Sequence, residues 1–173
     1  FYSEVREFIK KKNPDRKDWP LVSDFIITMN SAALIYFMSI IFKKLTYNFF
    51  YTYCKEKNDD KLRVIKTNKA CINFFKSFYH IVATVSGWYL MRNEEFVPPS
   101  LLGNGDMSLM EKNYPFYEGF YGYKYWFLGT MGYFLFEMIV CLTDKKRIDF
   151  MEMFLHHGVT LVAYFMAHYL CIL

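Results

Sequence analysis

The sequence predicts an all-α protein, a polytopic transmembrane helix bundle with four spanning helices. Of its 173 residues, 54% are hydrophobic and 21% are aromatic. The apolar residues gather in four blocks of roughly twenty residues, which is the length of helix that crosses a bilayer. Only helices and closed barrels span a membrane, and uniformly apolar blocks of this length are typical of helices. These observations exclude a soluble globular domain.

The blocks are delimited by charged and aromatic residues. They cover residues 21–42, 70–91, 125–142 and 150–173. Lys43-Lys44 closes the first block, and Tyr125-Trp126 opens the third with an aromatic pair of the kind that lies at membrane interfaces.

The loop charges predict a multi-pass protein whose basic loops face the cytosol. Residues 43–69 carry eight Lys and Arg and residues 144–149 carry three, whereas residues 92–123 carry two and are rich in turn-forming Pro and Gly. Residues 1–19 form a juxtamembrane segment with six basic residues. These conflict with the predicted orientation, because they would lie on the side opposite the cytosol. The net charge of +4 is then a signal of topology, and we expect no nucleic-acid partner.

The polar residues of the fourth block are the strongest sign of function. Those spaced by three or four share one helical face: Asp149, Glu152, His156, Thr160, Tyr164 and His168. His157 lies about 100° further round the helix. Because ionisable side chains are costly in lipid, this stripe should face the bundle interior or a cavity. A hydrogen-bonded seam explains one histidine, but adjacent histidines one turn from a carboxylate favour a functional site.

Two other blocks hold isolated polar residues at membrane depth. His80 lies within the second block, and Glu137 is the only formal charge of the third. We expect both to line the cavity of His156 and His157. An interhelical hydrogen bond explains His80 equally well, and Glu137 could instead pair with a histidine.

Residues 146–160 resemble a known motif. KRIDF at 146–150, followed by Glu152, His156-His157 and Thr160, is similar to the Lag motif of ceramide synthases in the TLC-domain superfamily. MGYFL at 131–135, Tyr114-Pro115, and Cys71 with residues 75–79 resemble further segments of that family. The resemblance divides the chain into the segment 1–19, a first helix with its basic loop at 20–68, and a partial TLC domain at 69–173.

The chain departs from the family pattern at three places. Ile148 stands where the family has Lys, and Phe75-Lys76 replaces Trp-Arg. The family has a Ser-Tyr pair near the position of Ala167-His168, and Tyr169 lies one place later. The family also continues into helices that carry paired aspartates, so we expect this chain to be a fragment that lacks part of its active site.

The resemblance implies N-acyl transfer from acyl-CoA to the amine of a long-chain sphingoid base, giving (dihydro)ceramide in the endoplasmic reticulum membrane. It implies His156 and His157 as the catalytic residues, no metal, and no cofactor beyond the acyl-CoA substrate. We expect membrane lipid around the bundle and a homo- or heterodimeric assembly.

The residues fit that chemistry. Histidine has the proton affinity to take a proton from an ammonium at neutral pH, and it can also accept an acyl group, so His156 and His157 remain alternatives as base and nucleophile. Supporting or orienting roles are expected for Asp149, Glu152, Thr160 and Tyr164. Contacts to the coenzyme A phosphates are expected from Lys145, Lys146 and Arg147.

Other classes of protein fit less well. A di-iron hydroxylase needs more histidines than the four present. A single metal held by His156, His157 and Glu152 is conceivable on ligand chemistry. The serious alternative is a non-enzymatic TLC-domain protein that binds or senses lipid or assists membrane insertion.

Overall fold

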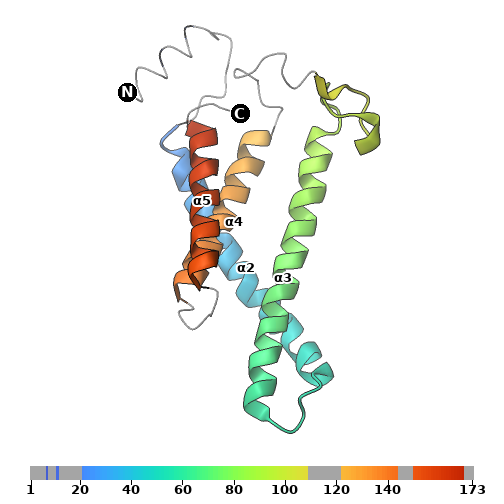
Figure 1. Cartoon of the computed structure of the whole chain (residues 1–173), viewed down its shortest axis with the longest axis vertical. Coiled ribbons are helices and arrows are strands. Elements are labelled where there is room, and N and C mark those ends of the chain that lie inside the picture. Colours follow the sequence, from blue (N-terminus) through green and yellow to red (C-terminus); the bar gives the residue numbers. More distant parts are fainter. Residues whose placement is uncertain (1–6, 8–10, 12–20, 109–121, 144–149, 170–173) are drawn as a thin grey trace. The chain divides into compact units, whose positions relative to one another are not determined.

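The computed structural model describes residues 7, 11, 21–108, 122–143 and 150–169, and all regular structure in them is helical. The elements are α2 (Asp24–Tyr53), α3 (Asp60–Met91), the 3-10 turn η1 (Pro99–Leu101), α4 (Tyr123–Thr143) and α5 (Phe150–Tyr169) (Figure 1). The predicted all-α fold class is confirmed, and each of the four apolar blocks contributes to one helix. By length and composition, α2 and α4 can each cross a membrane.

Two helices run further than the apolar blocks that predicted them. α2 continues through Lys43-Lys44, and α3 begins at Asp60, so the expected basic loop shrinks to residues 54–59. The side-chain Oδ1 of Asp59 caps α3 by accepting a hydrogen bond from the Leu62 amide at 3.0 Å. Charged residues end an apolar span, but Lys, Arg and Leu are good helix formers, so the backbone hydrogen bonding continues into water.

Residues Ala33–Ser86 form one compact unit, here called the hairpin unit, and the rest of the described chain forms another. Inside the hairpin unit, α2 and α3 contact each other through phenyl rings. The ring of Phe42 lies 5.4–5.6 Å, between centroids, from three rings of α3, those of Phe74, Phe75 and Phe78. Such aromatic pairs favour close packing of two helices.

An arginine closes the far end of the hairpin unit. Nε and Nη2 of Arg63 donate hydrogen bonds to the carbonyl oxygen of Tyr51 at 3.1 and 2.7 Å. That carbonyl belongs to the last turn of α2, where no later amide of the helix can reach it. The guanidinium also lies 3.8 Å from the centroid of the Tyr51 ring. One side chain of α3 therefore satisfies and covers the end of α2.

The second unit, here called the α4–α5 unit, holds α4, α5, the first turns of α2 and the end of α3. Gly132 of α4 allows α2 to approach closely. A Cβ atom at this glycine would lie 2.7 Å from Cβ of Ser31 and 2.8 Å from the carbonyl oxygen of Thr28. Small residues at such crossings are typical of membrane helices, because van der Waals contact replaces the hydrophobic driving force between helices in lipid.

The described part of the long loop is irregular, as its turn-forming residues predict. The amide of Gly105 donates to the Val97 carbonyl at 2.8 Å, and the amide of Gly103 donates to the Pro98 carbonyl at 3.1 Å. A Cβ atom at Gly105 would lie 1.7 Å from the carbonyl oxygen of Glu95, so this position requires glycine. The Tyr114-Pro115 pair lies outside the described residues.

Candidate functional site

α4 and α5 pack side by side as an antiparallel pair (Figure 1). Side-chain contacts fix their register. Phe127, near the start of α4, stacks on His168 near the end of α5 at a centroid distance of 6.0 Å. At the other end, Sγ of Cys141 lies 3.9 Å from the carbonyl oxygen of Phe150. Residues in the middle of α4 therefore face the first half of α5.

A buried carboxylate meets a buried imidazole in that middle region. Oε2 of Glu137 lies 3.8 Å from Nε2 of His157, within the range of an ion pair and beyond that of a direct hydrogen bond. The exposed fractions of the two side chains are 4% and 9%. The sequence left two roles open for Glu137, lining a cavity or pairing with a histidine. This geometry supports the pairing.

His156 lies beside this pair on the outer side of α5. Its ring centroid lies 5.4 Å from that of His157, and the residue is exposed in the isolated chain. The predicted polar stripe ran through His156, yet the histidine that α5 buries against α4 is His157. His157 is buried because of its position on the helix. Phe150, His157 and Tyr164 follow one another at intervals of seven residues, so they share the face that packs against α4.

The other predicted residues of α5 take different positions. The Thr160 hydroxyl donates to the carbonyl oxygen of His156 at 2.8 Å, one turn back in the same helix. Tyr164 packs between Phe127 and Phe134 of α4, with centroid distances of 4.8 and 5.1 Å. Glu152 is exposed.

Some predicted site residues are not tested. Four of them, Lys145, Lys146, Arg147 and Asp149, lie outside the described residues. His80 is exposed on α3 and belongs to the hairpin unit, so its place in a cavity with His156 and His157 stays a prediction. Among the residues that the structure describes, no three His, Cys, Asp or Glu side chains come together as a metal site would require.

The structure adds a second charged cluster that sequence reasoning missed. Oδ2 of Asp24 lies 3.0 Å from Nζ of Lys124 and 3.0 Å from Nε2 of His168, and it accepts a hydrogen bond from the Leu21 amide at 2.8 Å. The cluster joins the starts of α2 and α4 to the end of α5. The sequence contains one signal for this cluster, which is the position of Asp24 in the first turn of an apolar helix. An acidic residue there interacts favourably with the helix dipole and with the free backbone amides.

The two charged clusters mark different levels of the α4–α5 unit. Along α4, Lys124 and Glu137 are thirteen residues apart, which corresponds to about 20 Å of helix. Between them lies the aromatic layer of Phe127, Phe134 and Tyr164. A buried carboxylate–imidazole pair thus lies in the middle region of the apolar helix pair, and a three-helix ion cluster lies at one of its ends.

These features define a class of protein: a helical membrane protein with ionisable side chains buried between its helices. Residues 69–172 match the model of the TLC domain (TRAM, LAG1 and CLN8), and the chain belongs to this family. The match contains α4, α5 and most of α3, and therefore both residues of the Glu137–His157 pair. No curated protein and no solved structure matches the chain.

Proposed function

We propose that the protein is a membrane N-acyltransferase that makes (dihydro)ceramide from acyl-CoA and a sphingoid base. The observation that carries the proposal is the buried Glu137–His157 pair with His156 beside it, inside a TLC domain. The Lag-like sequence around these histidines supports the choice of reaction. The long apolar chains of both substrates place this reaction in a membrane, and the resemblance to ceramide synthases supports the endoplasmic reticulum as the proposed location.

The reaction needs a proton acceptor in a region poor in water. A sphingoid amine is an ammonium ion at neutral pH, and it must lose a proton before its nitrogen can attack the thioester carbonyl carbon. The new C–N bond forms as the C–S bond breaks, and the coenzyme A thiolate leaves with a proton. The nitrogen loses a second proton once the C–N bond has formed, so two protons leave it in all: a histidine that takes the first can return it to the leaving sulfur, and the second is released to water.

The two histidines suit different parts of this chemistry. Glu137 lies beside the His157 ring, where its charge would stabilise the imidazolium that a general base becomes. His156 is exposed beside it and is the imidazole that a substrate reaches first. Two routes follow: His157 activates the amine directly, or His156 first accepts the acyl group as an acyl-imidazole that the amine then attacks.

The test is ceramide formation from acyl-CoA and sphinganine by full-length protein in membranes, with His156→Ala and His157→Ala compared at equal abundance. Each substitution should lower the rate by about 10²- to 10⁴-fold, the usual contribution of a general acid–base group. If His156 carries the acyl group, an acyl adduct should map to it and vanish in His156→Ala.

His168→Ala is the matched control on the same helix. His168 lies in the ion cluster at the far end of α5, so its loss should reduce abundance while activity per folded molecule is kept. Near-normal specific activity of both His156→Ala and His157→Ala would refute the transferase assignment and leave a lipid-binding role.

A further inference from the structure

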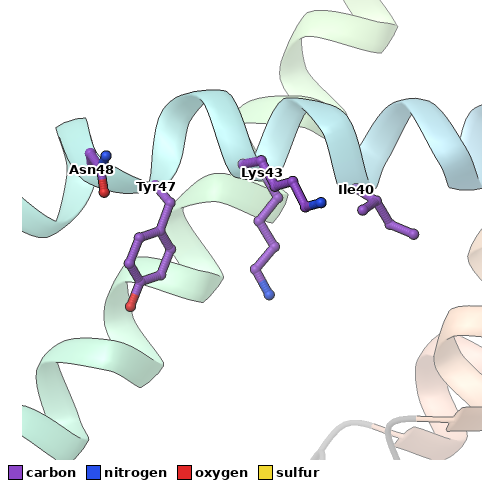
Figure 2. A pocket seen from close by; sticks show the side chains of 5 residues that line it. Ile40, Lys43, Tyr47 and Asn48 are labelled. Atoms are coloured by element: carbon purple, nitrogen blue, oxygen red, sulfur yellow. The ribbon is translucent and has the colours of Figure 1, made fainter.

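An open hollow lies on one face of α2, in the hairpin unit. It has a volume of about 420 Å³ and is lined by Ile40, Lys43, Lys44, Tyr47 and Asn48 (Figure 2). These residues follow the spacing i, i+3, i+4, i+7 and i+8, so they form one continuous stripe along the helix. Along the axis the stripe changes from an aliphatic side chain, through two ammonium groups, to a phenol and an amide.

The stripe lies at the depth of lipid head groups. α2 begins at Asp24, and the nineteen residues up to Phe42 make about 28 Å of apolar helix, close to the thickness of the hydrocarbon core. Lys43 and Lys44 therefore stand where the hydrocarbon ends. The aromatic residues that follow in α2 are typical of the membrane–water interface.

No competing anion is paired with Lys43 or Lys44 in the described part of the chain, whereas two other basic residues of the hairpin unit have partners. Lys66 is paired with Glu56, and Arg63 is hydrogen-bonded to the end of α2. Neither Lys43 nor Lys44 forms an ion pair with a residue in the described part of the chain. Two adjacent ammonium groups repel each other, and a bound anion relieves this repulsion.

We propose that this hollow binds an anionic glycerophospholipid whose head group carries hydroxyls. The order of the stripe matches the order of such a lipid: its acyl chains lie against Ile40, its phosphate between the two lysines, and its head-group hydroxyls within reach of Tyr47 and Asn48. A phosphate accepts hydrogen bonds from both ammonium groups, and the phenol and the amide can donate to or accept from hydroxyls. The site is separate from the histidines and does not depend on the transferase function.

The test measures lipid binding to the purified full chain by native mass spectrometry, with phosphatidylinositol, phosphatidylserine and phosphatidylcholine as probes. Phosphatidylinositol should bind most tightly. Lys43→Gln/Lys44→Gln should weaken its binding by about 25-fold, since each basic residue near an anionic lipid contributes roughly fivefold. Asn48→Leu should lower the preference for phosphatidylinositol over phosphatidylserine, and Lys43→Arg/Lys44→Arg should retain binding.

Lys55→Gln/Lys57→Gln is the matched control, because it removes the same charge from the loop next to α2 and should change binding by less than about twofold. Equal loss in both double variants would overturn the proposal in favour of a diffuse charge effect. Equal affinity for phosphatidylcholine would overturn it as well. So would displacement of phosphatidylinositol by soluble coenzyme A, which would make the hollow a site for free phosphates.

Discussion

The carboxylate of Asp24 and the imidazole of His168 meet at 3.0 Å, although 144 positions separate them in the chain. Lys124 completes the contact at the same oxygen atom, Oδ2. Three helices are thus joined through a single carboxylate whose exposed fraction is 4%. Because it is buried in an apolar unit, this carboxylate must keep its cationic and hydrogen-bonding partners for the fold to be stable.

We expect Asp24→Asn to destabilise the α4–α5 unit by about 3 kcal/mol, because the change removes the negative charge that faces Lys124 and His168. The measurement is thermal unfolding in detergent, where Tm should fall by roughly 10 °C. Glu56→Gln is the control, since its ion pair with Lys66 is exposed and contributes under about 1 kcal/mol. An equal Tm for Asp24→Asn and wild type would show that the cluster does not hold the helices together.

Two glycines of α4 should respond oppositely to the same substitution. Gly132→Ala places a methyl group 2.7 Å from Cβ of Ser31 and should cost about 1 to 3 kcal/mol through overpacking. Gly129 has open space around it, so Gly129→Ala should be neutral or should stabilise by up to about 1 kcal/mol through helix propensity. Both are measured by thermal unfolding. Equal effects would contradict the close approach of α2 to α4.

Glu137 should act on catalysis through the orientation and charge of His157. Glu137→Gln keeps the shape of the side chain and should lower kcat by roughly 10²-fold or more with little change in KM. Glu95→Gln in the exposed loop is the control. A variant with reduced abundance but unchanged kcat would show a structural role alone.

Membrane topology can be tested by labelling single introduced cysteines in intact membranes, in a Cys54→Ser background. Lys57→Cys and Lys146→Cys should be modified from the cytosolic side, because the basic loops are expected there. The loop between α3 and α4 is probed at Met107, which is 60% exposed. Gly105 is unsuitable for this purpose, since a side chain there would collide with the Glu95 carbonyl. Cytosolic labelling of Met107→Cys alone would reverse the orientation.

The apolar blocks predicted the ends of α3 and α4 well and the end of α2 poorly, although charged residues follow all three blocks. The block at 125–142 became α4 (Tyr123–Thr143), whereas the first block was extended by eleven residues to Tyr53. Hydropathy reports where a chain leaves the hydrocarbon, but a helix ends only where its backbone hydrogen bonds end. The end of α2 depended on a contact from Arg63, which lies in the next helix.

The sequence by itself determined that this protein is helical and membrane-embedded, and it predicts that adjacent histidines and a lone glutamate lie at membrane depth. Those conclusions follow from local composition and spacing, because a bilayer rejects polar groups wherever they occur in the chain. Only the tertiary structure decided that His157 is the histidine facing Glu137 and that Asp24 joins Lys124 and His168. Helical periodicity shows which residues share a face of one helix, but the partner of each face depends on how neighbouring helices pack. That packing depends on the sizes and shapes of side chains, for example on the absence of a side chain at Gly132.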